Sequence, residues 1–183
     1  MKHISFLLLL ILTGCKNDTK TEIQTENGID KSVYDMWNHY IASHPEFQKD
    51  ELPDAWYFHN NKEDANRLTK LVVNGKKKAG SGLYAWYKEA DAELPKIGTK
   101  HIITDFDGKA RAIIEIKNVD TIPFDKISKA YAALDMGTSI EPLQKWKKAH
   151  WEFFANTMEN NGETPTKKML IVCEIFETIW TEQ

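Results

Sequence analysis

Residues 100–119 read Lys-His-Ile-Ile-Thr-Asp-Phe-Asp-Gly-Lys-Ala-Arg-Ala-Ile-Ile-Glu-Ile-Lys-Asn-Val. Two runs rich in isoleucine, 100–106 and 110–119, flank the dipeptide Asp107-Gly108. Strands favour β-branched residues, and an Asp-Gly turn joins antiparallel strands because both of its residues tolerate a positive φ. The stretch therefore predicts a β-hairpin.

Helical patterns lie on both sides of this hairpin. Apolar residues recur every three or four positions in four segments, and Pro45 and Gly75 are the expected ends of the first two. Helices and strands in this order predict an α+β domain with a largely antiparallel sheet. The predicted elements outside the hairpin are helices at 33–41, 63–74, 124–134 and 143–159 and a closing strand at 168–180.

The first residues have the layout of a bacterial secretory signal. A basic start precedes the apolar run 6–12, which is far shorter than the roughly 20 residues that span a bilayer. The run ends in Leu12-Thr13-Gly14-Cys15, which looks like the site cut by lipoprotein signal peptidase. An ordinary secretory signal with an incidental cysteine is the alternative interpretation.

The lipoprotein interpretation divides the chain into three parts. Residues 1–14 are a signal peptide, 15–30 are a flexible polar tether that carries lipid on Cys15, and 31–183 are the folded domain. It also predicts a protein in the cell envelope, outside the cytoplasm and anchored to a membrane by its lipid.

Composition agrees with one globular domain. The chain has 183 residues, of which 42% are hydrophobic, and a formal net charge of −3. It therefore lacks a global attraction to nucleic acid, and any phosphate binding requires a local basic patch. The cysteines are Cys15 and Cys173, so lipid on Cys15 excludes an intrachain disulfide; Cys173, within an apolar run, is expected to be a buried thiol.

Five short segments carry a family resemblance. They occur in order and with matching separations, and together they resemble the ASCH (activating signal cointegrator homology) domain, within it the small stand-alone bacterial branch. The segments are Leu71–Ala79 with Gly75 and Lys77, Glu93–Gly98, Ile122–Ile127, Trp146–Phe154 and Val172–Phe176.

The resemblance implies a small PUA-like β-barrel with flanking α-helices and a cleft for RNA or a nucleotide-like ligand. Some members of the family are amidohydrolases that remove an acyl group from a modified cytidine, using a Gly-x-Lys-x-x-Thr motif and a downstream glutamate. The family lysine corresponds to Lys77, the threonine to Gly80 and the glutamate to Asp135. Ser81 is adjacent, but successive side chains of a strand alternate between faces, so it would replace the threonine only across a bulge.

Several aromatic side chains are further candidates for ligand binding, because nucleobases stack on aromatic rings. They are Trp56, Tyr84, Trp146 and His150, and core packing is the alternative for each. Lys76-Lys77-Lys78 is open to a second interpretation as a solvated basic turn. The histidines lack the spacing of metal ligands, so neither a metal nor another cofactor is predicted.

Three functions remain open from the sequence. The first is a monomeric, non-catalytic binding module for an RNA-like, nucleotide-like or other small polar ligand. The second is an envelope interaction protein with no small-molecule cleft. The third is a hydrolase of small amides or N-acylated nucleosides that uses Lys77, Asp135 and Ser81.

Overall fold

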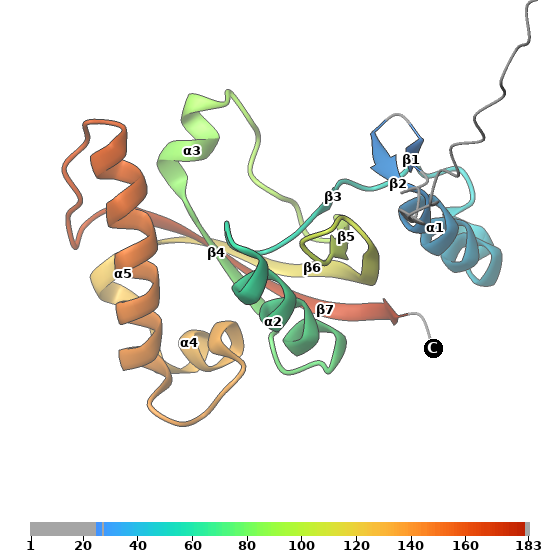
Figure 1. The fold of residues 1–183 in the computed structure, drawn as a ribbon. Coiled ribbons are helices and arrows are strands. Elements are labelled where there is room, and N and C mark those ends of the chain that lie inside the picture. The colour runs from blue at the N-terminus through green and yellow to red at the C-terminus, as the bar shows by residue number, and fades with distance from the viewer. Residues whose placement is uncertain (1–24, 27, 182–183) are drawn as a thin grey trace, which may run out of the picture.

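The structure is a computed structural model, and it describes residues 25–26 and 28–181 (Figure 1). The predicted signal peptide, Cys15 and most of the predicted tether lie outside these residues. Residues 25–26 and 29–30, at the end of that tether, form a short antiparallel pair. No helix in the described part of the chain is long and apolar enough to cross a bilayer.

Helices and strands are interspersed along the described part of the chain. In order they are β1 (Thr25–Glu26), β2 (Ile29–Asp30), α1 (Lys31–Ser43), the 3₁₀ turn η1 (Pro45–Phe47), β3 (Ala55–Trp56), α2 (Lys62–Val73), β4 (Ala79–Leu83), α3 (Tyr84–Glu89), β5 (Lys100–Thr104), β6 (Ala110–Pro123), the 3₁₀ turn η2 (Phe124–Lys126), α4 (Lys129–Met136), α5 (Pro142–Asn160) and β7 (Leu170–Thr181).

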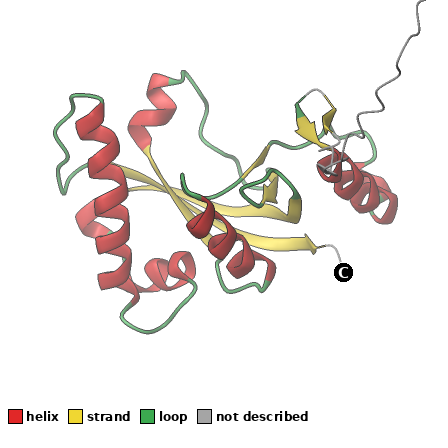
Figure 2. Ribbon diagram, in the orientation of Figure 1, coloured by secondary structure: helices red, strands yellow, loops and turns green. Residues whose placement is uncertain are grey.

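The main sheet has five strands in the order β3-β5-β6-β7-β4. Every neighbouring pair is antiparallel except β3 and β5, so the predicted α+β class with a largely antiparallel sheet is confirmed. Helices lie around this sheet (Figure 2). The register of β6 against β7 shifts at two places, and such irregularities bend a strand. A Cβ at Gly80 of β4 would lie 3.7 Å from the ring of Phe58, so the segment that follows β3 packs against β4 there.

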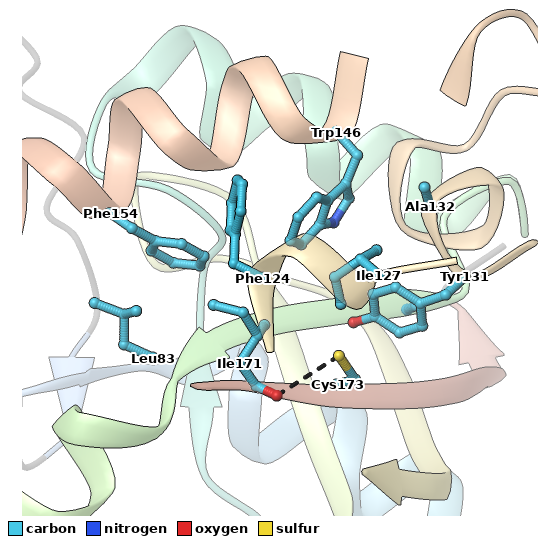
Figure 3. Close-up of a cluster of buried hydrophobic side chains, with 10 residues drawn as sticks. Leu83, Phe124, Ile127, Tyr131, Ala132, Trp146, Phe154, Ile171 and Cys173 are labelled. Atoms are coloured by element: carbon cyan, nitrogen blue, oxygen red, sulfur yellow. Dashed lines mark hydrogen bonds between the residues drawn. The ribbon is translucent and has the colours of Figure 1, made fainter. Parts of the chain in front are cut away.

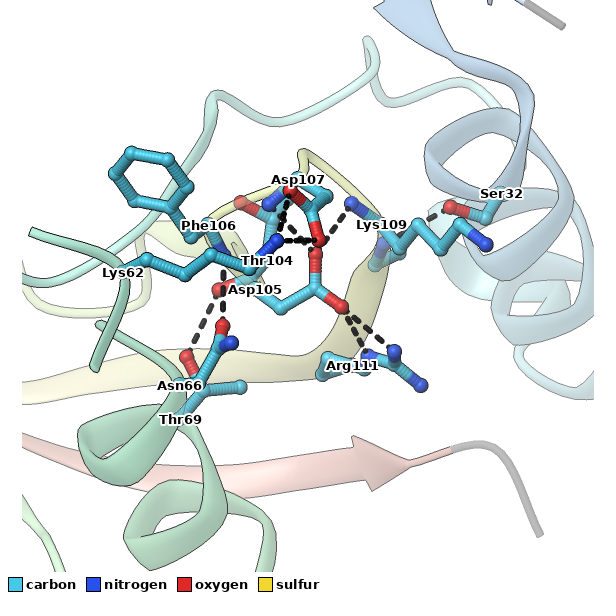
Figure 4. A network of polar contacts seen from close by, with 11 residues as sticks. Ser32, Lys62, Asn66, Thr69, Thr104, Asp105, Phe106, Asp107, Lys109 and Arg111 are labelled. Carbon is cyan, nitrogen blue, oxygen red and sulfur yellow. Dashed lines mark hydrogen bonds and ion pairs between the residues drawn. The ribbon is translucent and has the colours of Figure 1, made fainter. Parts of the chain in front are cut away.

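The predicted hairpin is formed by β5 and β6. Its first strand ends at Thr104 rather than at residue 106, because the Asp105 carboxylate accepts hydrogen bonds from the backbone N–H groups of Asp107 and Lys109 and from Arg111 (Figure 4). A carboxylate that binds these backbone donors holds the loop in a turn. The hairpin is then fixed to α2, where Thr69 Oγ1 donates to the Thr104 carbonyl.

One hydrophobic core lies between α4, α5 and the sheet (Figure 3). Trp146 and Phe154 of α5 are fully buried there. Cys173 is 2% exposed, and burial raises the pKa of its thiol to about 12, so the predicted buried thiol is confirmed.

The structure differs from the predicted elements in two places. The helix predicted at 124–134 is divided into η2 and α4, because the Ser128 hydroxyl accepts a hydrogen bond from the backbone of Tyr131 and caps a new helix. The segment Ala79–Leu83, with two glycines among five residues, forms the edge strand β4, and α3 follows it without a loop. Neither has a hydrophobic period that sequence reasoning could detect.

Candidate functional site

Lys77 lies between the end of α2 and the start of β4. Gly75 has φ +63°, and the N–H groups of Lys76 and Lys77 both donate to the Leu71 carbonyl, which ends the helix. Lys76 and Lys78 are exposed, whereas Lys77 is 4% exposed. The three lysines are therefore not a uniform solvated turn, and the middle one points into the protein.

Asp135, near the end of α4, is the partner of this buried lysine. Its side chain is 1% exposed, and its Oδ1 accepts an ion-paired hydrogen bond from Lys77 Nζ. The same ammonium donates to the Asp135 carbonyl over 3.0 Å, and the Lys78 N–H donates to the Leu134 carbonyl over 2.9 Å. These contacts join the α2–β4 connection to α4.

The second carboxylate oxygen of Asp135 has three polar neighbours. Ser81 Oγ donates to it over 2.6 Å and Trp146 Nε1 over 2.7 Å, while His150 Nε2 lies 3.3 Å away. Burial alone raises the pKa of the Asp135 carboxyl, but the Lys77 ammonium and His150 outweigh it, so the pKa lies well below its ordinary value. Asp135 is therefore ionised at neutral pH, and both of its carboxylate oxygens already accept hydrogen bonds.

His150 links this cluster to solvent. Its Nδ1 lies 3.0 Å from the Trp146 carbonyl one turn earlier, and its ring stacks on the Trp146 indole at a centroid distance of 4.2 Å. A carbonyl only accepts, so Nδ1 carries a proton, and Nε2 faces the Asp135 carboxylate. The two ring nitrogens of His150 thus bridge the Trp146 carbonyl and the Asp135 carboxylate.

The cluster forms the floor of a cleft of about 480 Å³ between α2 and α5. Lys77, Ser81, Asp135 and His150 all line it. Its walls carry aromatic rings and amides. On one side these are Phe58, His59 and Asn60, next to the guanidinium of Arg67. On the other side they are Phe153, Asn156 and Asn160 of α5.

The fold and this arrangement can now be compared with known proteins. The ASCH domain family model matches residues 54–180. This chain belongs to the ASCH domain family. An ASCH domain from Lactobacillus crispatus JV V101 is 28% identical, with a TM-score of 0.75 over 82% of this chain and 96% of that one. A protein from Enterococcus faecalis V583 is 31% identical, with a TM-score of 0.74 over 81% and 88%. No curated protein matches the chain.

The ASCH match confirms the PUA-like fold predicted from the sequence. One expectation about Ser81 needs correction. Strand β4 pairs with β7 in regular register, without the bulge that Ser81 was expected to require. A Cβ at Gly80 would point at the rings of Phe58 and Phe176, whereas the Ser81 hydroxyl reaches Asp135. Side chains do alternate along β4, but it is Ser81, not residue 80, that faces Asp135. A hydroxyl is therefore present beside Asp135.

The expected ligand contacts of the ASCH cleft divide into two groups. Lys77 and His150 line the cleft. Trp146 is 0% exposed and binds Asp135 with its indole N–H, so it supports the floor and does not contact a ligand. Trp56, in β3, packs edge-to-face on Phe58 at 4.8 Å and on His101, and Tyr84 begins α3, so neither of them lines the cleft.

Sequence reasoning missed the aromatic and amide walls of the ASCH cleft. His59 adopts φ +69°, which is uncommon for a residue other than glycine, and its ring lies 5.0 Å from that of Phe153. These residues come from segments that are more than 90 positions apart, so no local pattern could bring them together. Within the described residues, no three His, Cys, Asp or Glu side chains form a group that could hold a metal ion, and the absence of a cofactor stays a prediction.

Gly137, at the end of α4, packs closely against the backbone of Lys76, and its replacement tests this contact. Gly137 has φ +63°, and an added Cβ would lie 3.3 Å from the backbone carbon of Lys76. We expect Gly137→Ala to lower the free energy of unfolding by about 1–3 kcal/mol, measured by urea denaturation. Gly75 has the same φ with open space around it, so Gly75→Ala reports the backbone strain alone. Equal losses in the two variants would show that the contact with Lys76 contributes nothing.

Proposed function

We propose that this ASCH domain is a non-catalytic binding module for a nucleoside-like or other small polar ligand, held at a membrane by lipid on Cys15. The cleft supports the first part. Phe153 lines the cleft with an aromatic ring of the kind on which a base stacks, and Phe58 lines it with a ring that already carries the Lys77 ammonium 4.7 Å from its centroid. The amides of Asn60, Asn156 and Asn160 offer donors and acceptors for the edge of a base.

One observation about Asp135 carries the non-catalytic assignment: its carboxyl has a lowered pKa, and both of its oxygens already accept hydrogen bonds. A general base must accept a proton near the working pH, and a carboxyl with a strongly lowered pKa does so poorly. The Lys77 side chain already donates to both the carboxylate and the backbone carbonyl of Asp135. The three polar groups of the floor bind one another and present a fixed surface to the ligand.

Charge pairing also favours an uncharged ligand portion in the cleft. Arg67 donates to Asp64 over 2.7 Å, and Lys77 pairs with Asp135, so two of the cations on the lining are already neutralised. A neutral heteroaromatic group fits such a lining better than a polyanion, because a polyanion needs unpaired cations.

Membrane anchoring is supported by the sequence of the leader. The apolar run 6–12 and the segment Leu12–Cys15 have the order that lipoprotein signal peptidase recognises. Anchoring would place the cleft outside the cytoplasm, where small nucleosides and other exported or scavenged polar molecules are available and intracellular RNA is not.

A hydrolase is the second candidate, and the Ser81 hydroxyl favours it. This hydroxyl lines the cleft and donates to Asp135 over 2.6 Å, so a nucleophile is present where the motif position itself is glycine. The envelope interaction protein without a cleft has weaker support, because a cleft of about 480 Å³ is open beside the cluster.

Binding and turnover of cytidine and N4-acetylcytidine separate these candidates. We expect the full chain in detergent to bind nucleosides saturably in calorimetry and to release no acetate. Phe153→Ala should weaken binding about tenfold or more, since stacking on one base contributes about 1–3 kcal/mol. Tyr57→Ala is the matched control, because Tyr57 is 39% exposed and does not line the cleft. Acetate release that Ser81→Ala abolishes would instead establish the hydrolase, and absence of binding would end the ligand proposal.

A further inference from the structure

A second hollow lies on the other side of α5 from the cleft. This lysine groove, of about 420 Å³, is lined by Phe124, Asp125, Lys147, Lys148, Trp151 and Lys167. Its frame is fixed by backbone hydrogen bonds, because Phe124 N–H donates to the Met169 carbonyl and Asp125 N–H to the Lys167 carbonyl. Glu152 is the one described residue that lines both hollows.

The lysine groove is positively charged although the whole chain carries −3. Asp125 is neutralised by Lys168, whose Nζ lies 2.8 Å from Oδ2. The hydrogen bond from Lys168 and the nearby charges of Lys126 and Lys147 lower the pKa of the Asp125 carboxyl, which indicates that these lysines gather around it. Once Asp125 is paired, Glu152 is the remaining acidic side chain on the groove lining. The nearby cations outnumber it, and they are Lys126, Lys147, Lys148 and Lys167.

Two features of the groove suit a phospholipid surface. Its cations are all lysines, which act as point charges, whereas bidentate recognition of individual phosphates favours arginine. Half-buried Trp151 packs edge-to-face on Phe124 at 5.5 Å and forms part of the groove lining. Lysine and tryptophan side chains together are typical of protein surfaces at the level of lipid headgroups.

The opposite end of the domain has the opposite charge. Residues 30–54, which include α1 and η1, contain six acidic and two basic side chains. Helices α1 and α5 lie at the two ends of the sheet (Figure 1). An anionic membrane would therefore repel the α1 end and attract the α5 end, so the charge distribution favours one orientation.

We propose that the lysine groove docks this domain on anionic phospholipid headgroups of the membrane that carries its lipid anchor. This inference rests on the membrane part of the proposed function. The chain from Cys15 to Thr25, where the β1–β2 pair begins, can extend about 33–36 Å, and a domain of this size is about 40 Å across. A tether of this length spans most of the width of the domain, so the α5 end can contact the surface when the domain is tilted. Docking through the groove would leave the cleft on the side of α5 that faces away from the headgroups.

Energy transfer from a dye on α5 to acceptor-labelled lipid tests the docking. Gln144→Cys provides an exposed labelling site on α5, Cys173 is buried, and lipidated Cys15 is unreactive. The full chain is reconstituted in vesicles of phosphatidylcholine with or without 30% phosphatidylglycerol. We expect higher transfer on the anionic vesicles, reversed by 0.5 M salt, and lower transfer from a label at Ser43→Cys on α1.

Charge reversal with a matched control decides whether the groove is responsible. We expect Lys147→Glu/Lys148→Glu/Lys167→Glu to lower the docking equilibrium constant at least about a hundredfold, since each lysine near an anionic surface contributes about 1 kcal/mol. Lys49→Glu/Lys70→Glu/Lys88→Glu makes the same change in net charge at exposed positions outside the groove and should retain docking. Equal transfer on both vesicle types, or equal loss in both triple variants, would overturn the proposal.

The state of Cys15 separates failure of the anchor from failure of the groove. Mass spectrometry of the chain purified from bacterial membranes should find a diacylglycerol adduct on Cys15. If it finds a free thiol, the anchoring proposal fails. The groove is then tested alone by mixing the labelled Cys15→Ser chain with the same vesicles, where binding that needs phosphatidylglycerol and the three lysines supports docking and its absence refutes it.

Discussion

Replacement of Asp135 by alanine is expected to lower the free energy of unfolding by about 3–5 kcal/mol, because it leaves the buried Lys77 ammonium without its counter-ion. Lys77 is 4% exposed, so water cannot solvate the orphaned charge. The indole N–H of Trp146 and the Ser81 hydroxyl lose their acceptor in the same step. Urea denaturation followed by far-UV circular dichroism measures the loss.

An exposed ion pair provides the control for this prediction. Lys62 and Asp107 are joined over 2.8 Å, but both side chains are more than half exposed. Asp107→Ala should cost less than about 1 kcal/mol. The double variant Lys77→Met/Asp135→Leu should recover part of the loss, since replacing both charges removes the unpaired ion. A double variant as unstable as Asp135→Ala would mean that packing, rather than charge, sets the cost.

Local patterns in the sequence were sufficient for most of the fold. The hairpin at 100–119 and the helices at 33–41 and 143–159 all appear in the structure, because each combines a clear hydrophobic period with turn or cap residues. The edge strand Ala79–Leu83 could not be found this way. Two of its five residues are glycines, and it is a strand because it pairs with β7, not because of its own propensity.

The site could be predicted only where a motif marked it. Lys77 and Asp135 were placed together by the family resemblance, and the structure joins them. The role of Ser81 required knowledge of which face of β4 points inward, and a strand with no alternating pattern does not reveal its faces. His59 and Phe153 meet across the cleft through tertiary folding alone.

The polar cluster has a consequence for how the ASCH fold can vary. Because Lys77, Ser81 and Asp135 bind one another, they stabilise the junction of α2, β4 and α4 whether or not any chemistry takes place. That structural role is compatible with Asp135 in place of the glutamate that the family resemblance implies, and with a hydroxyl on Ser81 rather than at position 80. The cluster can therefore persist in a binding module after catalytic geometry has been lost, and its presence alone does not identify an enzyme.

The stability that Asp135 contributes is expected to disappear in acid. Its carboxyl has a lowered pKa in the folded protein and an ordinary pKa of about 3.9 in the unfolded chain. The unfolded state thus binds the proton first as the pH falls, so the contribution is complete above about pH 5 and declines below pH 4.

Comparison of Asp135 with Asp135→Asn, both in a His150→Gln background that removes the imidazole beside the carboxylate, isolates this effect from other titrating groups. Asp64 and Asp125 also have lowered pKa values, but they are present in both proteins and cancel in the difference. Urea denaturation at pH 7, 5, 3.5 and 2.5 should give a constant difference in the free energy of unfolding at the two higher values and a shrinking one below. A difference that stays constant or grows in acid would show that Asp135 is not held ionised by its cations, and the argument against its acting as a base would fail with it.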